Sequence, residues 1–260
     1  MRIDTAAAIL AAPRGAVAAH VTACRVRRYP LPQHVDSRLH LLRPPGSDHR
    51  ALAGAVIHTH PFSAADADVI DGLPTSSPAL TVLLALDDLP RDWGIAVVDH
   101  VLHTGDATRE QLDAELVRLR SLRHRSRKGL VLRDADGRAE SPLESLSRIR
   151  LVARGVPAPV LQPEFRDAQG VMRGDLGWPT YGVVGEADGM AKYGTGPTEM
   201  AARLAAQRER QDRLEALGLI VVRWTWDEIM QAPLMVAQRV LAALDRGAAL
   251  KRAGFWDRAA

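Results

Sequence analysis

Four acidic residues in the second half of the chain have the types and the spacing of a divalent-metal site. They are Glu144, Asp175, Glu186 and Asp188. A hairpin turn at residues 179–180 would bring Asp175 opposite Glu186, because the two lie at similar distances from the turn. Asp188 lies two residues beyond Glu186, and alternate residues of a strand share one face. The sequence therefore predicts three carboxylates at one edge of a sheet.

Carboxylates gathered in this way need a cation. Directly opposed side chains sit at a Cβ separation of about 4.5–5.5 Å, where like charges repel. Oxygen ligands suit Mg²⁺ or Mn²⁺ rather than zinc. A bound ion of this kind lowers the pKa of a bound water molecule and stabilises a phosphoryl transition state. The predicted chemistry is hydrolysis of a phosphodiester bond.

The same residues also have simpler explanations. An Asp or Glu on a strand is commonly a solvated acid on an exposed sheet face. Glu144 follows Ser141 by three residues, so it also fits a capping box at a helix start. Lys192 offers a cation for the scissile phosphate, although a lysine in the loop at 189–194 can equally be solvated. These alternatives stay open on the residues alone.

Helices and strands in a definite order must position the acids. Ser141 and Pro142 predict a helix start, and the helix continues to about Arg154. Three strand-like segments follow and predict an antiparallel meander, at Val160–Arg166, Val171–Trp178 and Tyr181–Asp188. Next come a helix at Thr198–Leu217 that Gly218 ends, a strand at Leu219–Trp226, and a last helix at Leu234–Leu244 opened by Pro233. The order is helix, three strands, helix, strand.

Several blocks of this half resemble one family. They are Ser141-Pro-Leu-Glu-Ser145, Arg173-Gly-Asp175-Leu-Gly-Trp-Pro179, Val184-Gly-Glu186-Ala-Asp188-Gly189 with Lys192-Tyr193, and Asp212-Arg213 before Gly218-Leu-Ile-Val-Val-Arg-Trp-Thr-Trp226. In this order they resemble the actinobacterial Vsr-like group called domain of unknown function 559, within the PD-(D/E)XK nuclease superfamily. The resemblance implies an α/β fold with a restriction-endonuclease-like αβββαβ core. It also implies a catalytic site in which Glu144, Asp175 and Glu186 hold Mg²⁺ or Mn²⁺, with Asp188 and Lys192 beside them.

The chain departs from the superfamily pattern at two places. Asp188 stands where the superfamily has a lysine two residues after its second acid. The long helix has Gln207-Arg208 where related sequences often have Glu-Lys. Arg208 can still bind a phosphate, and Arg173 and Lys128 are further candidates for contacts with nucleic acid. The function expected is a metal-dependent DNA endonuclease, and the alternative is a catalytically inactive DNA-binding regulator.

The first half predicts a smaller mixed α/β domain at residues 1–125, followed by a linker at 126–140 and the nuclease-like domain at 141–260. Thr108 and Gln111 form a capping box for a helix that runs to about Leu122. The motifs at Asp71–Thr81 and Asp99–His103 resemble the region that precedes the nuclease-like domain in related proteins, some labelled AbiEi-like antitoxins of toxin–antitoxin systems. The resemblance implies a domain without a complete winged helix.

A histidine pair in this half resembles part of a zinc site. His58-Thr-His60-Pro61 matches the start of the ligand set of JAMM-type peptidases, but Ser63 and Asp66 follow too soon for that family. No glutamate precedes Glu110, although that family needs one upstream. We therefore expect a strand with two histidines on an exposed face.

Composition limits the classes of protein. The 260 residues include 34 Lys and Arg against 31 Asp and Glu, so the net charge of +3 permits DNA binding without requiring it. Cys24 is the single cysteine, which excludes an internal disulfide and a thiolate metal cage. No run of about 18 apolar residues is present to span a membrane. A cytoplasmic protein is expected.

Overall fold

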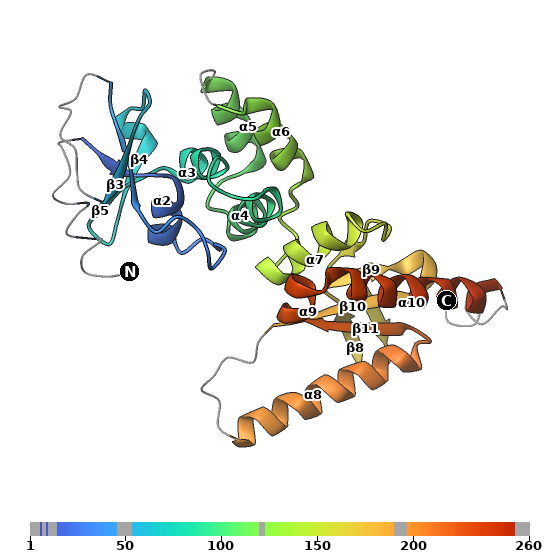
Figure 1. The fold of residues 1–260 in the computed structure, drawn as a ribbon. Coiled ribbons are helices and arrows are strands. Elements are labelled where there is room, and N and C mark those ends of the chain that lie inside the picture. Colours follow the sequence, from blue (N-terminus) through green and yellow to red (C-terminus); the bar gives the residue numbers. More distant parts are fainter. Residues whose placement is uncertain are drawn as a thin grey trace. The chain divides into compact units, whose positions relative to one another are not determined.

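The computed structural model describes Ala6, Ile9 and residues 15–45, 54–119, 123–189 and 197–252. The chain divides into two compact units, Met1–Pro142 and Leu143–Ala260. Both combine helices with a sheet, so the chain is a mixed α/β protein (Figure 1). Among the helices of the described residues, none is both long and apolar enough to cross a membrane.

The first unit contains a five-stranded mixed sheet in the order β3-β2-β1-β5-β4. Its strands are β1 (Val17–Ala18), β2 (Leu39–Arg43), β3 (Ala55–Thr59), β4 (Ala67–Ile70) and β5 (Leu73–Ser76). β2 and β3 run parallel, whereas β1 and β2 are antiparallel. The helix α2 (His20–Arg27) packs on this sheet, and Val26, Leu41 and Leu73 join one buried apolar cluster.

Helices make up the rest of the first unit. A short 3₁₀ turn, η1 (Ala64–Asp66), precedes β4, and α3 (Pro78–Ala85), α4 (Arg91–Thr104), α5 (Arg109–Arg118) and α6 (Arg125–Asp134) follow β5. The capping box of Thr108 and Gln111 is confirmed. The helix it begins ends at Arg118, and the expected end at Leu122 lies outside the described residues.

The expected linker at 126–140 is wrong over most of its length. Helix α6 occupies residues 125–134, and it packs against α4 and α5. Val131 and Leu132 are buried, so their apolar side chains hold this segment to the first unit. The boundary between the two units lies instead between Pro142 and Leu143.

The second unit begins with α7 (Pro142–Val152) and contains a four-stranded sheet in the order β11-β10-β9-β6. The strands are β6 (Val160–Leu161), β9 (Leu176–Trp178), β10 (Val183–Asp188) and β11 (Ile220–Thr225). The 3₁₀ turn η2 (Pro179–Tyr181) joins β9 to β10, and β11 lies parallel to β10. The order of helix, strands, helix and strand is the one the sequence predicts.

Two of the predicted strands are each broken in the middle. β7 (Glu164–Asp167) and β8 (Gly170–Arg173) leave the main sheet and form a separate hairpin. The break before β9 falls at Gly174, where a Cβ would come within 2.6 Å of Val184 Cγ1. The main chain can approach β10 there only because glycine has no side chain.

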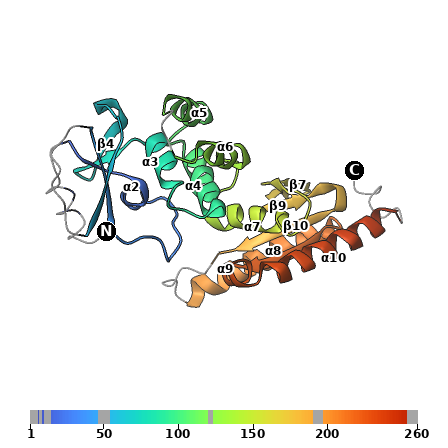
Figure 2. The same cartoon turned by 45° about the horizontal axis from the view of Figure 1, so that its top comes forward.

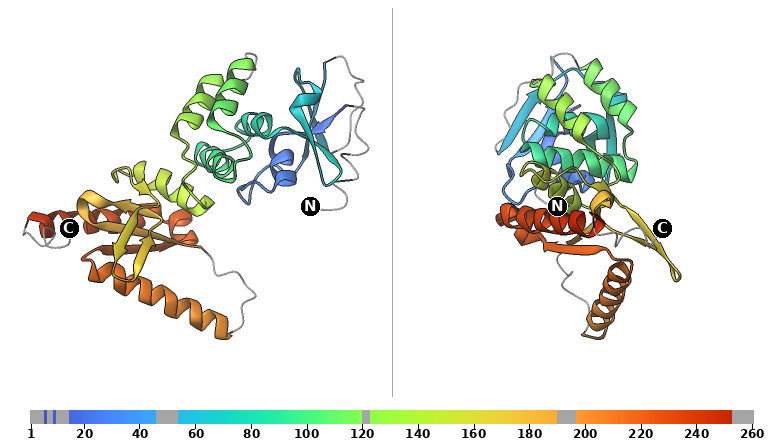
Figure 3. Two further views of the ribbon diagram at one scale, coloured as in Figure 1. Left: turned by 180° about the vertical axis from the view of Figure 1, so that it is seen from behind. Right: turned by 90° about the vertical axis from the view of Figure 1, so that its right-hand side faces the viewer.

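Three more helices complete the second unit: α8 (Pro197–Ala216), α9 (Trp226–Gln231) and α10 (Pro233–Arg252). α8 packs on β11, and α10 packs on β10 and β11. Figures 1 and 3 show these two helices on opposite faces of the sheet, and Figure 2 shows the same unit with α10 toward the viewer. Gly218 has φ +79° and ends α8 as predicted, whereas α10 continues well beyond the expected end at Leu244.

Candidate functional site

Asp175 and Glu186 lie side by side at the edge where β9 meets β10. The antiparallel register pairs Gly185 with Leu176, and the next pair in this register is Glu186 with Asp175. Asp175 Oδ2 accepts a hydrogen bond of 2.7 Å from the backbone N–H of Ala187. The hairpin predicted from the sequence therefore places the two acids as expected.

Glu186 is a buried carboxyl group with a strongly perturbed titration. Its residue is 3% exposed. Burial and the nearby charge of Asp175 raise the pKa of Glu186 to about 7, against the opposing effects of Arg210 and Arg223. Arg210 Nη2 donates to Glu186 Oε1 at 2.8 Å. Near neutral pH this group can therefore gain or lose a proton.

Asp188 shares the same face of β10 as Glu186. Its Oδ1 accepts a hydrogen bond of 3.0 Å from Arg223 Nη1 on β11 and one of 3.1 Å from Gln207 Nε2 on α8. Arg210 also comes from α8. Both acids thus face α8, and each is paired with an arginine of the same unit.

Glu144, on α7, is linked to Asp175 through Gln162, a residue that was not a candidate from the sequence. Gln162 Nε2 donates to Glu144 Oε2 at 2.7 Å, and the backbone N–H of Gln162 donates to the carbonyl of Asp175 at 3.1 Å. Gln162 has φ +52°, a left-handed conformation that costs a residue with a side chain about 1–3 kcal/mol. The strained backbone aims this amide at Glu144, which is itself buried.

The need for a compensating cation is met here by two guanidinium groups, Arg210 and Arg223. Neither was a candidate from the sequence. Glu186 and Asp188, which both face α8, are therefore each paired with an arginine of the chain itself. Lys192, the cation proposed from the sequence, lies outside the described residues.

The other basic candidates have different outcomes. Arg208 is exposed and lines an open groove of about 530 Å³ beside the β7–β8 turn at Gln169. Arg173 is exposed, and its carbonyl accepts a hydrogen bond from Arg210. The expectation that Lys128 contacts nucleic acid is wrong, because this side chain is 1% exposed and cannot reach a phosphate. Its Nζ donates to the carbonyl of Leu83 and to Asp87 Oδ2, at 2.6 and 2.8 Å.

The acids do not form a preassembled metal cage. Over the ranges that the structure describes, no three carboxylates offer ligand atoms that all lie within 4.8 Å of one another. The oxygen donors fit Mg²⁺ or Mn²⁺ by type. A metal ion would have to draw the carboxylates together and displace their arginine partners.

A second cluster, in the first unit, was not anticipated. His20, His40 and His58 offer ring nitrogens that all lie within 4.8 Å of one another. The expectation that His58 lies on an exposed face is wrong, because its ring stacks on that of His20 at a centroid distance of 3.8 Å. β3 ends at Thr59, so His60 does not continue the strand.

Comparison with known proteins finds distant relatives. The chain is 28% identical over 214 residues to uncharacterized proteins from two strains of Mycobacterium tuberculosis, CDC 1551 / Oshkosh and H37Rv. The match covers 80% of this chain and 74% of each relative. No family model and no solved structure matches the chain. The chain is thus similar to proteins whose names assign no activity.

Proposed function

We propose that the second unit is a metal-dependent DNA endonuclease of the PD-(D/E)XK type, with α7, β6, β9, β10, α8 and β11 as its αβββαβ core. The observation that carries this proposal is the buried carboxyl group of Glu186, which lies beside Asp175. The pKa of Glu186 is raised to about 7. Placing two acids together in a poorly solvated position is costly, and perturbed groups of this kind are concentrated at functional sites.

Asp175, Glu186 and Glu144 are the residues that would hold Mg²⁺ or Mn²⁺, with Asp188 beside them. Such an ion, when bound, supplies charge stabilisation to a phosphoryl transition state and an activated water molecule. Glu186 must lose its proton to act as a ligand. Gln162 fixes the carboxyl group of Glu144 by donating to its Oε2.

Arg210 has a second role in this proposal. In the described structure its guanidinium is divided between Glu186 and the carbonyl of Arg173. If a cation balanced the charge of Glu186, the guanidinium group of Arg210 would be available to bind a substrate phosphate. Arginine matches phosphate geometry with two donors at once. Arg208 and Arg173, both exposed, supply further charge for the DNA backbone.

A second candidate function rests on a specific observation. Arg210 and Arg223 already neutralise Glu186 and Asp188 without any metal. A unit stabilised in this way can bind DNA and cleave none. Asp188 in place of the superfamily lysine points in the same direction. This alternative is a catalytically inactive DNA-binding regulator, or an antitoxin-like protein of a toxin–antitoxin system.

Cleavage assays on plasmid, single-stranded and mismatched DNA, each with Mg²⁺ or Mn²⁺, distinguish the two functions. The test variant is Asp175→Asn, and the matched control is Glu164→Gln, an exposed acid of β7 outside the cluster. The endonuclease proposal expects cleavage by the wild type and the control and none by Asp175→Asn. Equal DNA binding by all three proteins, with no cleavage by any, would support the regulator.

A further inference from the structure

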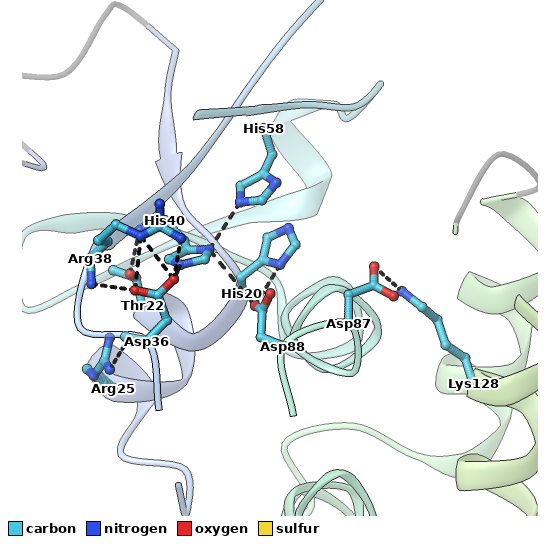
Figure 4. A network of polar contacts seen from close by, with 10 residues as sticks. All are labelled: His20, Thr22, Arg25, Asp36, Arg38, His40, His58, Asp87, Asp88 and Lys128. Carbon is cyan, nitrogen blue, oxygen red and sulfur yellow. Dashed lines mark hydrogen bonds and ion pairs between the residues drawn. The ribbon is translucent and has the colours of Figure 1, made fainter. Parts of the chain in front are cut away.

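Three imidazole rings converge inside the first unit, far from the acids in sequence and in a separate compact unit. Figure 4 shows His20, His40 and His58 turned toward one another, with Asp88 next to them. His40 Nδ1 lies 3.1 Å from His58 Nε2, and His20 Nδ1 lies 2.9 Å from Asp88 Oδ2. His20 and His40 are buried, and His58 is half-buried.

Each histidine comes from a different element. His40 lies on β2 and His58 on the parallel neighbour β3, where the register pairs Leu42 with His58. His40 is two residues before Leu42, so the two histidines share one face of the sheet as a diagonal pair. His20 opens α2, and its backbone has φ +53°, which is uncommon for a residue with a side chain. Strain at this position directs the ring of His20 into the cluster.

We propose that His20, His40 and His58 bind a divalent transition-metal ion of the zinc type, with Asp88 as the adjoining carboxylate. Three imidazoles and a fourth oxygen ligand form a common donor set for zinc. Imidazole nitrogen also binds cobalt, nickel and copper. The three nitrogen donors therefore define the class of ion, a divalent transition metal, and not one particular metal. The site is independent of the acids in the second unit and of the reaction proposed for them.

The distances fit the edges of a tetrahedral site. With zinc–nitrogen bonds of about 2.0–2.1 Å, neighbouring ligand atoms lie about 3.4 Å apart. The separation of 3.1 Å between His40 Nδ1 and His58 Nε2 and that of 3.9 Å between His40 Nδ1 and Asp88 Oδ2 lie on either side of this value. His20 and His58 stack in the described structure, so their ring planes must turn apart for both to bind the ion.

The carboxylate of Asp36 lies next to Nε2 of His40, the ring nitrogen that faces away from His58. Asp36 Oδ2 lies 3.2 Å from His40 Nε2, out of line for a full hydrogen bond. Arg38 holds this carboxylate through its Nε and Nη2. A carboxylate on the far nitrogen of a metal-binding histidine fixes the tautomer that leaves the other nitrogen free to coordinate. For His40 that nitrogen is Nδ1, the one that faces His58.

The competing explanation is a buried polar network without a metal. Burial lowers the pKa of His40, and it lowers the pKa of His58 to about 4, so both rings are neutral at neutral pH. Neutral imidazole is the form that coordinates metals, but it also forms ordinary N–H···N hydrogen bonds. A metal site needs both facing nitrogens of His40 and His58 to be unprotonated, whereas a hydrogen-bonded network keeps one proton between them, so zinc binding distinguishes the two.

The experiment titrates Zn²⁺ into the untagged, metal-free chain of 260 residues by calorimetry and records the visible spectrum of the Co²⁺ form. The test variant is His58→Gln, which changes the least buried ligand. The matched control is His60→Gln, two residues along the same segment, where His60 Nδ1 lies 2.9 Å from the carbonyl oxygen of Pro61. Asp36→Asn tests the carboxylate behind His40. Circular dichroism of each variant checks that it folds.

The proposal expects one Zn²⁺ per chain, a tetrahedral Co²⁺ spectrum, and the loss of both in His58→Gln but not in His60→Gln. Asp36→Asn should weaken zinc binding by about 10–100-fold. A higher melting temperature with Zn²⁺ is expected for the wild type, since ligand binding to the folded state stabilises it. The absence of stoichiometric binding by the folded wild type, or equal binding by His58→Gln and His60→Gln, would overturn the proposal.

Discussion

Asp175, directly before β9, and Glu186, on the antiparallel neighbour β10, lie side by side, yet their carboxyl groups are held by different partners. Asp175 Oδ2 accepts from the backbone N–H of Ala187, whereas Glu186 Oε1 accepts from Arg210 on α8. Burial, together with the nearby charge of Asp175, raises the pKa of Glu186 to about 7. The pair therefore contains one acid that titrates near neutral pH.

The raised pKa of Glu186 predicts a loss of stability as the pH rises. The pKa of Glu186 is about 7 in the folded chain, against an ordinary value of 4.5, so the folded state holds the proton more tightly. Its contribution to the free energy of unfolding is present below the unfolded pKa and is lost as the pH rises through about 7. The loss is on the order of 3 kcal/mol.

The substitution Glu186→Gln tests this relationship. The amide carries no charge, so the variant should be more stable than the wild type above about pH 7 without divalent metal. Urea unfolding of both proteins across the titration range measures the difference. If the difference in unfolding free energy does not change with pH, the buried titrating carboxyl group is not as described.

Metal binding should have the opposite dependence on pH. Because Glu186 must be ionised to act as a ligand, the affinity for Mn²⁺ should increase as the pH rises toward about 7 and level off above it. Electron paramagnetic resonance titrations of free Mn²⁺ at several pH values measure this affinity. Glu186→Gln is the control and should show weak binding at every pH. An affinity of the wild type that is independent of pH would argue against Glu186 as a ligand.

Local sequence rules predicted the elements that carry the acids. Ser141 and Pro142 marked the start of α7, Gly218 marked the end of α8, and the turn at 179–180 set the hairpin register. These features depend on nearby residues, so a single sequence contains them. The restriction-endonuclease-like core and the metal remain proposals.

The choice of Arg208 over Arg210 shows where such rules stop. The two residues are about 200° apart around a helix, so the packed face of α8 decides which one meets the sheet. Leu214 is buried with Met172 and Val184. Arg210 lies four residues before Leu214 and therefore on the same face. That apolar position was the signal in the sequence that could have identified Arg210.

Lys128 and the histidine cluster were missed for different reasons. Lys128 lies three and four residues before Val131 and Leu132, so it shares their buried face although it ends a basic run. The histidines meet only because β2 and β3 pair in parallel and His20 has a left-handed backbone. Neither the pairing nor the strain is visible in the sequence.

Substitution of the buried Lys128 should lower the stability of the chain and leave its DNA binding unchanged. Lys128→Met leaves Asp87 without its buried partner, so it should reduce the free energy of unfolding by about 3 kcal/mol or more. DNA affinity of the folded variant should be unchanged.

Arg208→Ala should behave in the reverse way, with stability within about 0.5 kcal/mol of the wild type and weaker, less salt-dependent DNA binding. Urea unfolding and fluorescence anisotropy at several salt concentrations measure both, and exchanged outcomes would contradict these assignments.

Gly185 predicts how tightly β10 is packed beside Glu186. A Cβ at this position would come within 2.5 Å of Trp224 and 3.2 Å of Trp178. Trp224 is also fixed by its N–H, which donates to Ser147 Oγ at 2.8 Å. Gly185→Ala should therefore destabilise the chain by about 1–3 kcal/mol.

The matched control for Gly185 is Gly129→Ala on α6, where the new Cβ would meet Leu116 at an ordinary 3.8 Å. Alanine is favoured over glycine inside a helix by about 0.5–1 kcal/mol, so this variant should be no less stable than the wild type. Thermal and urea unfolding measure both variants. Equal effects of the two substitutions would show that the aromatic packing around Gly185 is looser than described.

We propose above that the acids around Glu186 cleave DNA with a divalent metal. The most direct measurement is single-turnover cleavage of plasmid, single-stranded and mismatched DNA in Mg²⁺ or Mn²⁺ by the wild type and Glu186→Gln, purified in parallel. We expect metal-dependent cleavage by the wild type and a loss of at least about 100-fold in the variant, comparable to the loss of one transition-state interaction. Equal cleavage by both proteins, or DNA binding by both without any cleavage, would contradict it.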